Sequence, residues 1–333
     1  MDIQLGGLHH VSAITGDVAL NLDFYRRVLG LRLVKKTVNQ DDVSAYHLFY
    51  GDEVGNPGTE MTFFDFPGAA PSIPGSGTIS AIAFWVPDRA AIDWWADRFA
   101  ALGISHGDIV ERRGRATLAF ADAEGQSLEL VAPGEGESVP TLNTPWSRSP
   151  APVDRQILGL HAVRIIVGRG DATIQALTAV LGFREVGGYS LADVNGATER
   201  TIRVFEVGPG GIGTEVHVDI RPELPIGQAG VGGVHHVAFR TPNAEDHRAW
   251  QKKVAATGLR VTDVIERYYF KSIYFREPSG VLYEIATDGP GFTADEDLAH
   301  LGERLSLPPF LEPRRARIEA GLRPVDSMPV GAE

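Results

Sequence analysis

The sequence contains no cysteine among its 333 residues. Disulfides, iron–sulfur clusters and cysteine-ligated zinc sites are therefore excluded, and the composition suits a reducing compartment. No apolar run approaches the roughly 20 residues of a membrane-spanning helix. Residues 1–5 also lack the charged segment and apolar core of a signal peptide. We therefore expect a cytoplasmic protein without a membrane partner.

Basic residues are also scarce, with 31 Lys and Arg against 43 Asp and Glu, a formal net charge of −12. No basic run is present, which argues against a nucleic-acid partner. The hydrophobic content of 43% is ample for a core. The length indicates two domains of ordinary size or one repeated architecture.

A repeat is visible in the glycines that follow four amphipathic segments. They are Gly30, Gly103, Gly182 and Gly258, spaced about 75 residues apart, and each stands where a helix would end in a left-handed cap. Each unit reads as a short strand, a turn with Asp or Asn, a helix and several short strands. The sequence thus predicts an α+β protein of four βαβββ units, paired into two strongly curved, half-open barrels.

The repeat also suggests domain boundaries. Residues 1–135 hold units one and two, residues 158–290 hold units three and four, and the Pro-rich stretch 136–157 reads as a linker. Residues 291–333 read as a helical tail, with a charged helix at 312–319 on the surface or at a subunit contact. In the helices, Asp88 and Asn243 are candidate N-caps, and Trp95 and Trp250 are interpreted as core.

Histidines recur at one position of the repeat. The second histidine of a His-His-Val pair is His10 in unit one and His236 in unit four, whereas the same position is Ala81 in unit two and Ala162 in unit three. The histidine His161 is one residue out of register, so it competes with His10 only if a one-residue gap is allowed.

Glutamates recur within the closing strands of two units. The position holds Glu284 in unit four and Glu129 in unit two, and in unit one it falls near the apolar Met61 or Phe63. His217 lies near the site of unit three in an uncertain register. A glutamate among apolar strand residues is costly to bury unless it is paired or bound to a metal.

Units one and four thus offer two imidazoles and one carboxylate: His10, His236 and Glu284. That set, with other positions open, is the facial triad of oxygen-activating Fe(II) enzymes. A four-ligand isomerase site would need a second carboxylate where Met61 or Phe63 stands. Zinc is chemically possible, but the helical H-E-x-x-H spacing is absent.

Four further residues are candidates for the surroundings of the metal. Alternation along a strand points His9 and His235 to the opposite face, unless a bulge turns them toward the pocket as hydrogen-bond donors. A three-residue hairpin loop at 278–280 places Tyr274 opposite Glu284, where its phenol could donate a proton. Arg267 precedes the same strand, and it either stabilises an anionic phenolate or ring-opened product or is an exposed charge at the strand edge.

The repeated unit with His…His…Glu resembles the vicinal oxygen chelate superfamily, which has the glyoxalase/bleomycin resistance/dioxygenase fold. Segments similar to its bacterial ring-cleaving dioxygenases of the hydroquinone type are Gly7–Ser12, Leu33–Asn39, Tyr46–Asp52, Gly55–Thr59 and Phe310–Arg315. The resemblance implies metal ligation by His10, His236 and Glu284. It also implies a pocket containing His9, Ser12, His235, Arg267 and Tyr274.

The function expected from this resemblance is Fe(II)-dependent cleavage of a dihydroxylated aromatic ring by O2, with Mn(II) as a second possible ion. A small aromatic substrate and O2 are the expected partners, and family analogy favours a homo-oligomer. Two other functions stay open: a glyoxalase-type metal-dependent lyase or isomerase, and a non-catalytic resistance protein that binds a quinone or drug. Spacing does not distinguish catechol from hydroquinone.

Overall fold

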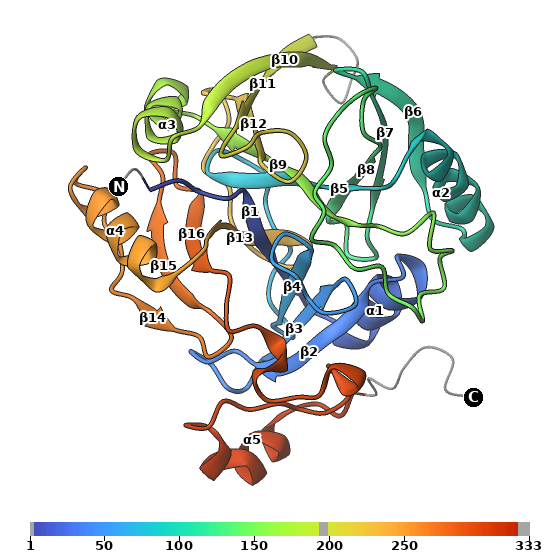
Figure 1. Cartoon of the computed structure of the whole chain (residues 1–333), viewed down its shortest axis with the longest axis vertical. Coiled ribbons are helices and arrows are strands. Elements are labelled where there is room, and N and C mark those ends of the chain that lie inside the picture. The colour runs from blue at the N-terminus through green and yellow to red at the C-terminus, as the bar shows by residue number, and fades with distance from the viewer. Residues whose placement is uncertain (1–2, 193–198, 326–333) are drawn as a thin grey trace.

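Two curved sheets organise the chain in this computed structural model, which describes residues 3–192 and 199–325 (Figure 1). Each sheet has eight strands, as the α+β prediction of two half-open barrels required. The first sheet has the order β14-β15-β16-β13-β1-β4-β3-β2 and the second the order β10-β11-β12-β9-β5-β8-β7-β6.

The first sheet is built from the first and fourth units of the repeat. Its strands are β1 (Leu8–Thr15), β2 (Arg32–Val38), β3 (Tyr46–Gly51), β4 (Glu60–Asp65), β13 (Gly233–Thr241), β14 (Ile265–Glu266), β15 (Lys271–Arg276) and β16 (Leu282–Thr287). The antiparallel pair β1–β13 joins the two units at the middle of the sheet.

The second sheet is built in the same way from units two and three. Its strands are β5 (Thr78–Trp85), β6 (His106–Arg112), β7 (Arg115–Ala121), β8 (Ser127–Val131), β9 (Gly159–Val167), β10 (Arg184–Ala192), β11 (Glu199–Glu206) and β12 (Glu215–Ile220). Both sheets therefore contain strands from before and after the 136–157 stretch, which itself contains no helix or strand.

Each unit's helix follows its first strand and ends near the expected glycine. The helices are α1 (Val18–Leu22) continued by the π-helix Asp23–Val28, α2 (Arg89–Leu102), α3 (Gly170–Gln175) continued by the π-helix Ala176–Val180, and α4 (Ala244–Ala255). Asp88 and Asn243 accept hydrogen bonds from the first turns of α2 and α4, as predicted. All four glycines have a positive φ of 70–84°, a conformation that a β-carbon disfavours.

The β1–β13 pairing contains two β-bulges that matter for the site. Leu8 pairs with Phe239 and His10 with Ala238, so His9 has no partner across the pair, and His235 is skipped in the same way on β13. The second sheet repeats the pattern on β5 and β9, where Ser80 and His161 are skipped. Such bulges rotate a side chain away from simple alternation.

The C-terminal segment is less helical than the sequence suggested. Residues 292–311 contain only two short 3-10 turns, Phe292–Ala294 and Leu298–His300. The predicted charged helix appears as the turn Glu312–Arg314 and α5 (Arg315–Gly321). The paired prolines at 308 and 309 and glycines at 289, 291 and 302 interrupt a longer helix. Residues 326–333 of the predicted tail lie outside the described residues.

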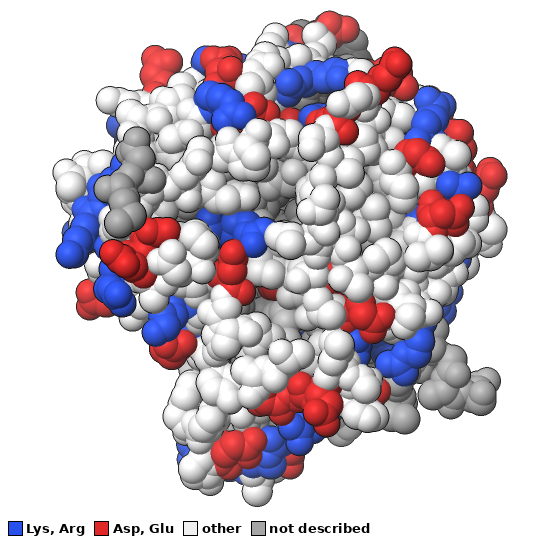
Figure 2. Space-filling view, in the orientation of Figure 1, with Lys and Arg blue, Asp and Glu red and all other residues white. Residues whose placement is uncertain are grey.

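This segment instead packs along β2, below the first sheet in Figure 1. The fully buried Lys35 of β2 pairs with Asp295 at 2.7 Å and with Glu296. Phe292 contacts Phe49 of β3 with ring centroids 5.1 Å apart. Within the described part of the chain, no helix is long and apolar enough to cross a membrane. Figure 2 shows acidic and basic side chains interspersed around the edge of one face.

Candidate metal centre and cleft

Three side chains from neighbouring strands converge on the inner face of the first sheet. His10 lies on β1, His236 on the adjacent β13 and Glu284 on β16, which pairs with β13. The two histidine Nε2 atoms are 3.2 Å apart, and Glu284 Oε2 lies 3.3 Å from His10 Nε2 and 2.9 Å from His236 Nε2. All three residues are at most 3% exposed.

The spacing of these three atoms matches the needs of a metal ion. Ligands about 2.1 Å from a metal and at right angles to each other are about 3 Å apart. Glu284 Oε1 accepts a hydrogen bond from Ser272 at 2.5 Å, while Oε2 has no hydrogen-bond partner among the described residues. Burial raises the pKa of Glu284, but His10 and His236 outweigh it and hold the pKa well below its ordinary value. The carboxylate is therefore ionised, which is the form that binds a cation.

A chain of hydrogen bonds determines which nitrogen His10 presents. His9 Nε2 lies 3.1 Å from the carbonyl oxygen of Thr287 and must donate to it, because a carbonyl only accepts. Burial lowers the pKa of His9 to about 3, so the ring is neutral and its Nδ1 is an acceptor. His10 Nδ1, 3.0 Å away, then carries the proton that it donates to His9, and His10 Nε2 keeps its lone pair.

His236 has the same kind of partner. Its Nδ1 lies 2.7 Å from Nδ1 of His235, whose pKa burial lowers to about 3. The sequence left open whether a bulge would turn His9 and His235 toward the pocket, and the bulges place each ring against the neighbouring histidine. Their Nδ1 atoms can accept from these neighbours, whereas the sequence suggested that they would act as donors.

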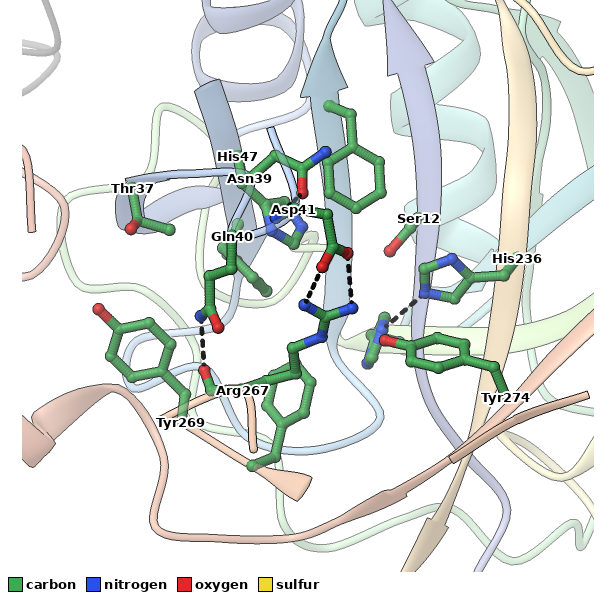
Figure 3. A pocket seen from close by; sticks show the side chains of 14 residues that line it. Ser12, Thr37, Asn39, Gln40, Asp41, His47, His236, Arg267, Tyr269 and Tyr274 are labelled. Carbon is green, nitrogen blue, oxygen red and sulfur yellow. Dashed lines mark hydrogen bonds and ion pairs between the residues drawn. The ribbon is translucent and has the colours of Figure 1, made fainter. Parts of the chain in front are cut away.

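A cleft opens onto His10 and His236, with about 430 Å³ of empty space including its open mouth. Ser12, Arg267 and Tyr274 line it together with His10 and His236 (Figure 3). Its apolar wall includes Phe49, Phe64 and Phe270. This lining of aromatic side chains with a few polar groups suits a small aromatic ligand.

Tyr274 lies where the hairpin argument placed it. It pairs with Glu284 across β15 and β16, and Gly280 in the connecting loop has a φ of 108°. Its ring meets that of His236 edge-on at 5.6 Å between centroids. Burial raises the pKa of Tyr274, so the phenol keeps its proton at neutral pH. Of the two readings of Arg267, the structure supports the pocket position: its guanidinium lies 5.7 Å from the centre of the Tyr274 ring.

The position symmetric to Glu284 is occupied by Thr62, not by Met61 or Phe63 as the sequence suggested. In the parallel pairing of β1 and β4, Ser12 lies opposite Thr62, just as Ala238 lies opposite Glu284. The Thr62 hydroxyl is 2.7 Å from that of Ser12. Met61 and Phe63 alternate to the other face and are core residues. The absence of a carboxylate at this position was nevertheless predicted correctly.

Sequence reasoning missed several cleft residues, among them His47 and Asp41. His47 of β3 is 3.1 Å from the Thr62 hydroxyl and lies between Phe49 and Phe64, with ring centroids 4.0 and 4.2 Å away. Asp41, in the loop between β2 and β3, pairs with Arg267. A histidine in an apolar strand was the available signal for the first, whereas nothing in the sequence brings residue 41 to residue 267.

The second sheet carries a different polar cluster at the matching place. Ala81, Ala162 and Glu129 fall at the positions of His236, His10 and Glu284, as the repeat predicted. His161 corresponds to His9 and not to His10, because Ala162 lies opposite Glu215 as His10 lies opposite Glu60.

His161, Glu215 and His217 are nevertheless close enough together to hold an ion. Arg115 already lies against this group, with Nη1 2.9 Å from Glu215 and 3.2 Å from His161 Nε2. Its guanidinium also pairs with Glu137. A cationic side chain thus takes the place that a metal would need.

The fold and the His/Glu groups define a class: proteins of two curved half-barrel sheets with residues that could hold a metal ion. The chain belongs to the Glyoxalase/Bleomycin resistance protein/Dioxygenase superfamily, whose sequence model matches residues 7–130 and 159–285. The resemblance found in the sequence and the predicted fold class are therefore confirmed.

Relatives over nearly the full length carry names of ring-cleaving enzymes. The chain is 46% identical to a Bacillus subtilis (strain 168) protein provisionally named ring-cleaving dioxygenase MhqA, over 97% of this chain and 100% of that one. It is 30% identical, over 93% of both chains, to the chlorohydroquinone/hydroquinone 1,2-dioxygenase of Sphingobium indicum.

Solved structures show the same fold. A Bacillus subtilis protein provisionally described as a dioxygenase matches with a TM-score of 0.87 and 37% identity, over 99% of this chain and 100% of that one. Glyoxalase I of Zea mays matches with a TM-score of 0.61 and 15% identity, over 85% and 92% of the two chains. The second likeness concerns the fold alone.

Proposed function

We propose that the protein is a metal-dependent ring-cleaving dioxygenase that uses Fe(II), or alternatively Mn(II), to open a dihydroxylated aromatic ring with O2. The observation that carries the proposal is the triangle of His10 Nε2, His236 Nε2 and Glu284 Oε2, with edges of 2.9–3.3 Å, beside a cleft that the two histidines line. The names of the full-length relatives support the same reaction and favour a hydroquinone-type substrate.

His10, His236 and Glu284 would hold the ion. When bound, such an ion supplies a Lewis-acidic, redox-active centre with open ligand positions. Glu284 contributes the negative charge, and Ser272 fixes its other oxygen. His9 and His235 act as positioning residues, because each accepts the Nδ1 proton of the neighbouring ligand and leaves that ligand's Nε2 free.

The cleft itself binds and orients the ring. Phe49, Phe64 and Phe270 offer aromatic surface against which a planar substrate can pack. Tyr274, held beside His236 and protonated at neutral pH, is the proton donor on one side. Ser12, joined to Thr62 at 2.7 Å, offers a hydroxyl on the other.

Thr62 supports this reaction over a glyoxalase-type lyase or isomerase. Such a four-ligand site needs a carboxylate at the position symmetric to Glu284, and a threonine hydroxyl is a poor substitute for one. The lyase would work without oxygen. A non-catalytic binding protein would bind a quinone without turnover and would keep that binding after Glu284→Ala.

The test is oxygen uptake by protein reconstituted anaerobically with Fe(II), offered methylhydroquinone, chlorohydroquinone and catechol in turn. We expect uptake that requires Fe(II) and is lost in Glu284→Gln and His236→Ala. Glu129→Gln, which changes the matching carboxylate of the second sheet, is the control and should retain activity. A folded protein that binds one iron per chain and consumes no oxygen with any diol would refute the proposal.

A further inference from the structure

We propose that Asp41 makes the cleft selective for uncharged dihydroxylated rings over carboxylated ones, by occupying the guanidinium of Arg267. The inference rests on the proposed function for its substrates, but the contacts that carry it are independent of the metal.

The ion pair is formed across the mouth of the cleft. Arg267 Nη2 lies 2.8 Å from Asp41 Oδ2, and Nη1 lies 3.2 Å from Oδ1, which is a two-point contact (Figure 3). The same loop is held a second time, because Gln40 Nε2 donates to the Arg267 carbonyl oxygen at 2.9 Å. These two contacts hold Asp41 at the mouth of the cleft, although its side chain is largely exposed to solvent.

The pair leaves the cleft without a cationic side chain that is free to bind a substrate. Among the described residues that line the cleft, Arg267 is the one lysine or arginine, and Asp41 is the one aspartate or glutamate. A carboxylate on a substrate ring would meet a guanidinium that is already bound and a second carboxylate beside it. Like charges at this distance repel, and the incoming group would lose its water without a new partner.

An uncharged ring bears no such cost. A ring with chloro or alkyl substituents can pack against Phe49, Phe64 and Phe270 while the ion pair stays intact. Arg267 lies over Tyr274, 5.7 Å from the ring centre, and both side chains line the cleft. The cleft therefore favours substrates without a negative charge.

Removing the Asp41 charge should reverse this preference. The Asp41 side chain is 71% exposed, so Asp41→Asn leaves the fold intact. The guanidinium, whose own side chain is 18% exposed, would then be available for bidentate binding of a carboxylate. The kcat/KM for a carboxylated ring should rise, whereas the kcat/KM for an uncharged ring should not.

The experiment compares kcat/KM for chlorohydroquinone and for 2,5-dihydroxybenzoate in the Fe(II)-loaded protein. We expect the natural protein to favour chlorohydroquinone and Asp41→Asn to shift the ratio at least tenfold toward the carboxylated ring. Asp41→Glu should retain the original ratio. Asp42→Asn is the matched control, because it removes one charge from the same loop at an exposed residue that accepts a hydrogen bond from the Ser44 backbone. It should leave the ratio unchanged.

Adding Arg267→Gln to Asp41→Asn should abolish the shift, since the freed guanidinium is its cause. A ratio that stays within twofold in Asp41→Asn would overturn the inference. So would an equal shift in Asp42→Asn, or a natural protein that prefers the carboxylated ring.

Anaerobic calorimetry with 4-chlorophenol and 4-hydroxybenzoate separates this inference from the proposed function, because neither ligand is a diol. A tenfold gain in relative affinity for 4-hydroxybenzoate in Asp41→Asn would support the charge argument even if no diol is cleaved. Cleavage of diols with unchanged binding preferences would leave the proposed function standing and refute the role of Asp41.

Discussion

Replacing His9 by leucine should weaken metal binding without touching a ligand. In the metal-bound protein His10 must carry its proton on Nδ1, and His9 Nδ1, 3.0 Å away, is the acceptor for it. Leucine would leave that buried N–H unpaired. In the metal-free variant, which lacks the His9 acceptor, the proton can move to Nε2 and face Glu284 Oε2 at 3.3 Å, so the cost falls mainly on the metal-bound form.

An unpaired buried donor costs about 1–3 kcal/mol. At about 1.4 kcal/mol per tenfold, the metal dissociation constant should rise by about 5- to 140-fold. Competition against a chelator of known affinity measures this constant, with circular dichroism to confirm the fold. His9→Gln, whose amide oxygen can accept, should recover part of the loss.

His161→Leu is the control for this prediction, because His161 occupies the same bulge of the second sheet beside Ala162. It should leave the metal dissociation constant unchanged. If His9→Leu alters that constant by less than twofold, the hydrogen-bond chain does not set the proton position of His10 and the reasoning is wrong.

Three further outcomes are expected. Tyr274→Phe should lower kcat about 100-fold with metal content unchanged, and an unaltered kcat in stopped-flow assays would remove the phenol from the mechanism. Arg115→Met should lower the free energy of unfolding in urea by about 3 kcal/mol, because it leaves the buried Glu215 without its cation; a loss below about 1 kcal/mol would contradict this. Burial raises the pKa of Glu129, but Arg164 and Arg112 outweigh this effect and lower the pKa to about 2. The ionised carboxylate therefore stabilises the fold above pH 4.5, and this contribution fades as the pH falls toward 2. Urea titrations between pH 6 and 3 should show a flatter decline in Glu129→Gln, and equal slopes would contradict the shift.

Local rules predicted much of the fold. The helix ends at Gly30 and Gly103 follow from the left-handed backbone that glycine alone adopts freely. The placement of Tyr274 opposite Glu284 follows from a hairpin loop of fixed length. Both depend on neighbours in the chain, and so they are readable from it.

The wrong predictions concern features that depend on contacts between distant segments of the chain. Thr62 replaced Met61 or Phe63 because a shift of one residue in the pairing of β4 exchanges the two faces of the strand. The tail lost most of its predicted helix because its prolines and glycines interrupt it, and contacts of Lys35 with Asp295 and Glu296 hold it against β2. The register of β4 and the position of the tail both depend on contacts between distant segments.

The sequence alone determined the four-unit repeat and singled out His10, His236 and Glu284, because recurrence at a fixed spacing survives without coordinates. Only the tertiary structure decided how these residues meet, since β1 and β13 are more than two hundred residues apart and their register depends on side-chain packing. The bulges that turn His9 and His235, and the approach of Asp41 to Arg267, likewise depend on contacts between distant segments. The pairing of distant strands determines the geometry of the site, whereas the residue types that determine its chemistry are visible in the sequence.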